Sequence, residues 1–171
     1  MSRRPNESLQ SRRGILTLIA LLVVVADRLS KEAIGGLLKG SGPVQIAEGS
    51  LRLIHSENRG GLFGLFQGSA PLLAGLSLAV ISLLVFVHEQ ELKQRASLLT
   101  LATGLLIGGA LGNLIDRLAH GFVFDFIDIG IGSVRFWTFN VADMAITLGI
   151  LLLLSQTLLA ERSSRSGGSD E

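Results

Sequence analysis

Three long apolar stretches constrain the fold of this chain more than any other feature. They cover residues 70–87, 96–115 and 139–160. Each is close to the length of about 20 residues that a helix needs to cross the hydrocarbon core of a bilayer. The composition agrees, because 48% of the residues are hydrophobic, only 17% are charged, and the mean hydropathy is +0.53. We therefore expect an integral membrane protein rather than a soluble domain.

A fourth apolar stretch, residues 15–26, is too short to cross a membrane unless Asp27 and Lys31 lie near the far edge. A basic leader before a short apolar run is also typical of a cleaved signal peptide, but three further spans favour a retained first helix. The predicted fold is an all-α membrane protein, a four-transmembrane-helix bundle in a single domain of residues 1–160. Its spans are expected at about residues 15–34, 70–87, 96–116 and 139–160.

The distribution of Lys and Arg predicts the orientation of this bundle. Residues 1–14, 88–95 and 161–171 hold eight of these side chains, whereas the longer segments 35–69 and 116–138 hold five. Because cytoplasmic segments carry the excess of Lys and Arg, both termini are expected in the cytoplasm. The last segment is rich in Ser and Gly and is expected to be a disordered tail.

The composition gives little support to nucleic-acid binding or metal chemistry. The formal net charge is only +1, so no concentrated basic surface is available for nucleic acid. The chain has no cysteine, and its three histidines, His55, His88 and His120, are scattered. A metal centre is therefore a minor hypothesis.

The segments outside the predicted spans contain three patterns. Residues 43–56 alternate apolar and polar side chains around Glu48-Gly49, which is typical of a β-hairpin. Residues 58–66 mix glycines with bulky apolar residues, which favours either an interfacial loop segment or a short re-entrant one. Aromatic residues within 122–128 and at 136–137 are expected to lie in the headgroup layer.

The apolar stretch of residues 96–115 contains glycines at four-residue spacing. Gly104, Gly108 and Gly112 form the small-xxx-small pattern that lets membrane helices approach closely. Asn113 and Asp116 follow them and share a helix face. Asp116 has Arg117 beside it, so a structural ion pair or a snorkelling side chain is an alternative to a functional role.

The apolar stretch of residues 139–160 opens with a second pair of polar residues, Asn140 and Asp143. Asp143 has no basic residue within a turn on its own helix, so it must find its partner in another segment or in water. Asp125 lies between Phe124 and Phe126, and an extended strand would point it away from both rings. Two carboxylates that meet in a membrane-edge pocket share a proton, so that one acts as general base and the other as general acid. Spacing alone does not say which carboxylates meet.

These motifs together closely resemble the bacterial lipoprotein signal peptidases, or signal peptidase II. The matching elements occur in the family's order and cover residues of about 15–160. They are Asp27 with Lys31, Asn58-x-Gly60-x-x-Phe63, the run from Gly108 to Arg117, Val123-x-Asp125-Phe126, and Phe139-Asn140-x-Ala142-Asp143. The resemblance implies an aspartic endopeptidase that removes the signal peptide of diacylglyceryl-modified prolipoproteins by cleaving before the lipidated cysteine.

The resemblance also assigns roles to single residues. Asp125 and Asp143 match the catalytic pair, and no cofactor is implied. Substrate-binding or site-shaping roles are implied for the remaining matches, which are Asp27, Asn58, Asn113, Asp116, Arg117 and Asn140. We expect the protein in the bacterial cytoplasmic (inner) membrane, as a monomer in contact with lipid, with its active site at the extracytoplasmic face. A small membrane transporter or channel and a non-enzymatic membrane assembly protein are the competing hypotheses, but the inner halves of the spans contain almost no charge.

Overall fold

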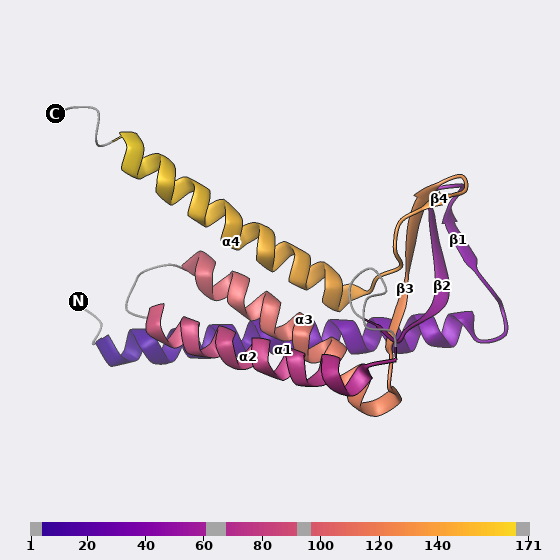
Figure 1. Cartoon of the computed structure of the whole chain (residues 1–171), viewed down its shortest axis with the longest axis horizontal. Coiled ribbons are helices and arrows are strands. Elements are labelled where there is room, and N and C mark those ends of the chain that lie inside the picture. Colours follow the sequence, from indigo (N-terminus) through magenta and orange to yellow (C-terminus); the bar gives the residue numbers. More distant parts are fainter. Residues whose placement is uncertain (1–4, 61–67, 92–96, 167–171) are drawn as a thin grey trace.

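The computed structural model describes residues 5–60, 68–91 and 97–166, and within these ranges it contains four helices and one four-stranded sheet. Figure 1 shows the sheet at one end of the helices, with the first turns of α1 and the last turns of α4 at the other end. The helices are α1 (Pro5–Leu38), α2 (Ala70–Glu91), α3 (Ser97–His120) and α4 (Val141–Ser166). The strands are β1 (Val44–Ala47), β2 (Leu51–Asn58), β3 (Val123–Ile131) and β4 (Val134–Arg135).

Among the described residues, three helices are long and apolar enough to cross a membrane. The candidate segments are Ala70–Gln90, Leu98–His120 and Val141–Leu159, and they coincide with three of the predicted spans. α1 is longer than any of them, but its apolar run is bounded by Arg13 and Asp27. α4 continues to Ser166, so part of the segment predicted as a disordered tail is helical, and residues 167–171 lie outside the described residues.

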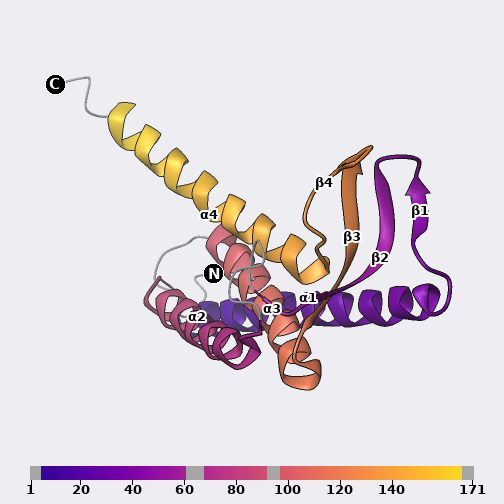
Figure 2. The ribbon, with the colours of Figure 1, turned by 45° about the vertical axis from the view of Figure 1, so that its right-hand side comes forward.

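α3 is the central helix and packs against α1, α2 and α4 (Figure 2). Its glycines make this possible, as the small-xxx-small pattern predicts. A Cβ atom on Gly108 would lie 2.8 Å from the carbonyl oxygen of Ala20 in α1, and one on Gly104 would lie 2.9 Å from Ile19. At Gly112 a Cβ would meet Asp27 of α1 at 2.8 Å and Ala142 of α4 at 3.2 Å. Three helices therefore meet around Gly112.

The sheet is antiparallel, with strand order β1-β2-β3-β4. β1 and β2 confirm the predicted hairpin, and Gly49 takes a φ of 70° at its turn, a conformation that favours glycine. The sheet is larger than the predicted hairpin because residues 123–131 form a long strand beside β2. Most of the predicted interfacial segment, residues 61–66, lies outside the described residues.

Asp128 joins the strands of the sheet through two arginines. Its buried carboxylate pairs with Arg52 of β2 and with Arg135 of β4, the second at 3.0 Å. Burial alone would raise the pKa of Asp128, but hydrogen bonds and charge from the two arginines hold it below its usual value. Arg135 also donates to the backbone carbonyl of Gly49 at 3.2 Å. These contacts tie β2, β4 and the β1–β2 turn to β3, the strand that carries Asp125.

Candidate active site

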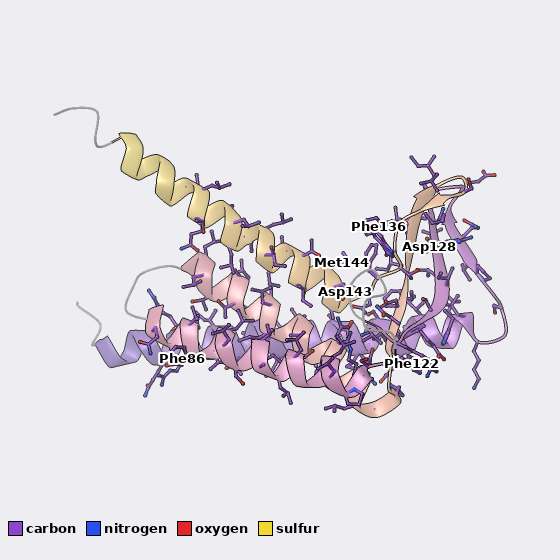
Figure 3. The ribbon with its side chains drawn as sticks, viewed as in Figure 1. Phe86, Phe122, Asp128, Phe136, Asp143 and Met144 are labelled. Carbon is purple, nitrogen blue, oxygen red and sulfur yellow. The ribbon has the colours of Figure 1, made fainter. Side chains whose placement is uncertain are left out.

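A cluster of polar side chains lies where α1, α3 and α4 meet the sheet. Figure 3 shows Asp143 at the start of α4, on the side toward the strands. Several members are almost completely shielded from solvent, and Asp27, Asp116, Asp125 and Asn140 are each 2% exposed or less. Buried groups of this kind are normally paired and hydrogen-bonded. We call this the polar cluster, and its members are Asp27, Arg28, Lys31, Asn58, Asn113, Asp116, Arg117, Asp125, Asn140 and Asp143.

The first turn of α4 is closed by a reciprocal cap between Asn140 and Asp143. The backbone N–H of Asp143 donates to Asn140 Oδ1 at 2.9 Å, and the backbone N–H of Asn140 donates to Asp143 Oδ2 at 3.2 Å. This is a capping box, in which a side chain before the helix and another in its first turn each satisfy a free backbone donor. The cap fixes one oxygen of Asp143 and leaves the other for a neighbouring helix.

Asn113 of α3 and Asn140 connect Asp143 with Asp125. Asn113 Nδ2 donates to Asp143 Oδ1 at 2.7 Å. Asn140 Nδ2 donates both to Asn113 Oδ1 at 3.1 Å and to Asp125 Oδ1 at 2.7 Å. The partner of Asp143 thus comes from another helix, as the sequence predicts, and a continuous chain of amide groups joins the two carboxylates.

Asp125 lies in β3 with Phe124 and Phe126 on the other face of the strand, where their ring centroids are 5.8 Å apart. Its second oxygen accepts a hydrogen bond from Asn58 Nδ2 at 3.0 Å. Burial and the negative charge of Asp143 raise the pKa of Asp125 to about 7, and the hydrogen bonds from Asn58 and Asn140 oppose part of that rise. A carboxyl group with this pKa exchanges a proton near neutral pH.

Asp116 does not pair with its neighbour Arg117. Its carboxylate pairs instead with two cations of α1, Arg28 at 2.6 Å and Lys31 at 2.8 Å, and accepts the backbone N–H of Phe124 at 3.2 Å. The alternative of a structural ion pair is thus realised with partners from another helix. Asp116 joins α1, α3 and the start of β3.

Arg117 is directed toward backbone carbonyl groups. It donates to Gly60 O at 3.2 Å and to Asn113 O at 3.4 Å. Asn58 holds the same short segment, because its Oδ1 accepts the backbone N–H of Gly60 at 3.1 Å. These contacts fix the end of β2 beside Asp125.

Asp27 supports the start of α4 from the first helix. Its Oδ1 accepts the backbone N–H of Ala142 at 3.0 Å, and its Oδ2 accepts Lys31 Nζ at 2.7 Å. Arg28 and Lys31 were not among the site residues expected from the sequence, although the spacing of Asp27 and Lys31 is that of an ion pair on one helix face. Among the described residues, no group of three or more His, Asp or Glu side chains is arranged to hold a metal ion.

Sequence comparisons place the chain among known proteins. Residues 19–159 match the model of the family described as signal peptidase (SPase) II. A protein of Syntrophomonas wolfei subsp. wolfei named lipoprotein signal peptidase is 44% identical over 139 residues, covering 81% of this chain and 89% of that protein. A protein of the same name from Caulobacter vibrioides is 41% identical over 169 residues, covering 95% and 97%.

Solved structures give the same result for the fold. A bacterial membrane enzyme determined by the in meso method at 2.3 Å resolution superposes with a TM-score of 0.74. It is 29% identical, and the match covers 92% of this chain and 93% of that one. A second, at 1.9 Å resolution, gives a TM-score of 0.72 at 31% identity. Because the sequence and structural matches extend over most of its length, the chain belongs to the signal peptidase II family, a family of membrane aspartic peptidases.

Proposed function

We propose that the protein is an aspartic endopeptidase that removes the signal peptide from diacylglyceryl-modified prolipoproteins, cleaving before the lipidated cysteine. The observation that carries this proposal is the connection of Asp125 and Asp143 through two buried amides, Asn113 and Asn140. Membership of the signal peptidase II family and the names of the relatives support the substrate class.

The two carboxylates have different surroundings, which supports different roles. Both carboxylates accept a hydrogen bond on each oxygen, but only Asp143 lies in the first turn of a helix, where the helix dipole stabilises negative charge. The pKa of Asp125 is raised to about 7, so this group carries a proton for much of the time at neutral pH. We assign Asp143 as the general base and Asp125 as the general acid.

In the proposed reaction, Asp143 takes a proton from a water molecule as the water oxygen attacks the peptide carbonyl carbon. Asp125 gives its proton to the carbonyl oxygen, which would otherwise carry the developing negative charge. When the carbon–nitrogen bond breaks, the leaving nitrogen takes the proton held by Asp143, and the hydroxyl group returns a proton to Asp125. The pair ends in its starting protonation state.

The charges of the polar cluster support a single shared proton on this pair. The cluster contains three cations and four carboxylates. They are Arg28, Lys31 and Arg117, and Asp27, Asp116, Asp125 and Asp143. If Asp125 and Asp143 share one proton, the formal charges of the cluster sum to zero. If both were ionised, the buried cluster would carry one uncompensated negative charge.

Other residues of the cluster either shape the edge of the site or hold the two carboxylates in position. Arg117 and Asn58 hold Gly60 beside Asp125, so they shape the edge along which the peptide lies. Asn113 and Asn140 orient the two carboxylates, and Asp27 holds the start of α4.

We also propose α1 as a fourth span, with both termini in the cytoplasm and the sheet at the extracytoplasmic face of the bacterial inner membrane. The sheet lies at one end of the helices (Figure 1), and its strand β3 carries Asp125. This position supports a site at the membrane edge, the depth at which a lipid-anchored substrate presents its scissile bond. The exposed apolar side chains of Ile131, Val134, Phe136 and Trp137 support contact with the headgroup layer. The proposed enzyme acts as a monomer.

Substitution of the two aspartates tests the mechanism. Asparagine keeps the size of aspartate but cannot cycle a proton, so Asp125→Asn and Asp143→Asn should each lower kcat by about a thousandfold or more. Because the two residues act as a unit, the double variant should be scarcely worse than either single variant. The measurement is hydrolysis of a lipidated prolipoprotein by purified protein in detergent, with a chelator present.

Glu48→Gln, an exposed substitution in the β1–β2 turn, is the matched control and should keep full activity. Substantial turnover in either single asparagine variant would contradict the mechanism. Activity that requires an added metal ion would contradict it as well.

A further inference from the structure

Lys31 is a buried cation that takes no part in the proposed reaction steps. Its side chain is only 4% exposed, and its ammonium group has three N–H donors. Three acceptors surround it, which are Asp27 Oδ2 at 2.7 Å, Asp116 Oδ2 at 2.8 Å and Asn113 Oδ1 at 3.5 Å. The contacts with Asp27 and Asp116 are ion pairs. The third contact is with Asn113, the residue that donates a hydrogen bond to Asp143.

The contact between Lys31 and Asn113 favours one of the two orientations of the Asn113 amide. An amide side chain has one acceptor and one donor end, and exchanging them reverses every hydrogen bond it makes. On one side of Asn113, Lys31 and Asn140 both present donors, so the oxygen must face them. The nitrogen then faces the carboxylate of Asp143 and donates to it at 2.7 Å.

Without the cation, this preference weakens. Asn140 alone would hold the oxygen end of Asn113 in place, and Asn140 is shared with Asp125. If the amide turned over, its oxygen would face the carboxylate of Asp143, and the two acceptors would repel each other. Lys31 therefore contributes to the alignment of Asp143 through Asn113, although no hydrogen bond joins Lys31 and Asp143 in the described part of the chain.

Lys31 also acts on the pair through its charge. Its positive charge favours the ionised form of Asp125 and so opposes the effect of burial on the pKa of that group. The other charged groups around the pair come from α1 and α3. They are Asp27 and Arg28 on α1, and Asp116 and Arg117 on α3.

We propose that Lys31 is a positioning residue of the aspartate pair, whose ammonium group holds Asn113 with its nitrogen toward Asp143 and offsets part of the negative charge of the pair. The expected effect of Lys31 on kcat rests on the proposed function. Its expected effect on the titration of the aspartate pair does not depend on peptide cleavage. Because Lys31 is buried and is not proposed to contact the substrate, its substitution should lower kcat and leave KM nearly unchanged.

The first test compares Lys31→Met with Lys39→Met, an exposed control just beyond the end of the same helix. Lys31→Met should lower kcat by about tenfold to a hundredfold with little change in KM, because the base is no longer aligned. It should also move the midpoint of the pair's titration upward by about one pH unit, because a nearby positive charge is lost. The midpoint is followed by infrared titration of the protonated carboxyl band that is absent from Asp125→Asn, so no substrate is required.

A second variant covers the case in which Lys31→Met fails to fold because Asp27 has lost its cationic partner, whereas Asp116 keeps Arg28. Asp27→Asn/Lys31→Met removes one charge of each sign, and the new amide oxygen can still accept the backbone N–H of Ala142. It should fold, with a titration midpoint close to the wild-type value because the charge of Asp27 is also gone. Its kcat should stay low, because nothing replaces the donor to Asn113.

Wild-type kcat in the double variant would overturn the proposal, since Lys31 would then be only a counter-ion for Asp27. An unmoved infrared midpoint in folded Lys31→Met would also overturn it, even if the wild-type protein cleaves prolipoproteins normally. If the wild-type protein cleaves no prolipoprotein but the midpoint shifts as expected, the proposed function fails and the positioning of the pair by Lys31 stands.

Discussion

Asp125 lies in an environment that disfavours its ionised form, and this has a consequence for stability. Its pKa is about 7 in the folded protein and about 4 in an unfolded chain, so the folded state binds more protons between these values. The stability contributed by this group is therefore present at low pH and lost as the pH rises through 7. Asp125→Asn, which cannot ionise, should be more stable than the wild type at pH 8 by on the order of 2 kcal/mol.

The measurement is the thermal midpoint in detergent at pH 8 and at pH 5. The advantage of Asp125→Asn should shrink toward pH 5, where the wild-type group is protonated. A variant that is less stable than the wild type at pH 8 would show that Asp125 is a stabilising anion and not a raised-pKa acid.

Asp27 is the residue whose loss should damage the fold most directly. Asp27→Ala removes one partner of the buried Lys31 and the acceptor for the Ala142 N–H at the start of α4. The expected cost is about 3 kcal/mol of stability, a larger effect than on the chemical step itself. Glu32→Ala, an exposed substitution on the same helix, should be nearly neutral in the same thermal unfolding measurement. Normal stability with complete loss of turnover would instead place Asp27 in the catalytic set.

The sequence points to several residues of the site but not to their hydrogen-bond partners. The i,i+3 spacing predicts that Asn140 and Asp143 share a face, and the structure shows that they cap the same helix turn. The partner of Asp116 could not be predicted, because Arg28 and Lys31 reach it only through the packing of α1 on α3. Spacing within one helix carries no information on that contact.

At the scale of the elements, the close approach of α1 and α3 depends on the glycines of α3. Gly108→Ala should destabilise the protein by about 1–3 kcal/mol, because the new Cβ would lie 2.8 Å from the Ala20 carbonyl oxygen, a backbone atom that cannot move aside. Gly75→Ala in α2 is the matched control, since no atom lies within 4 Å of its Cβ position. The control should be neutral or slightly stabilising, because alanine favours a helix more than glycine does.

Thermal unfolding in detergent distinguishes these two alanine variants. Equal thermal midpoints for Gly108→Ala and Gly75→Ala would show that α1 and α3 accommodate the added Cβ without loss of stability, which would contradict a packing role for Gly108.

The elements themselves differ in how far the sequence reveals them. α2, α3 and α4 follow from apolar length alone, because the bilayer sets the length of a spanning helix. The strand of residues 123–131 is harder to recognise, because its buried side chains include Val123, Phe126 and Asp128 and do not alternate cleanly with exposed ones. Its pairing with β2 connects segments far apart in the chain, and local pattern does not encode that pairing.

For the whole molecule, the orientation in the membrane can be measured with single cysteines, because the chain has none of its own. Ser50→Cys and Ser133→Cys lie in exposed turns of the sheet and should react with a membrane-impermeant thiol reagent in intact spheroplasts. Gln90→Cys, at the opposite end of α2, should react only after the membrane is opened. The reverse pattern of labelling would contradict the proposed orientation.

The polar cluster takes Asp27 and Lys31 from the first helix and Asn140 and Asp143 from the start of α4, which comes last in chain order among the described elements. A ribosome-bound chain that has not yet reached residue 143 lacks one of the two carboxylates of the proposed pair. The proposed pair therefore comes together only after the start of α4 has been made and has packed against α1 and α3, so insertion of the first three helices alone does not give a site able to cleave.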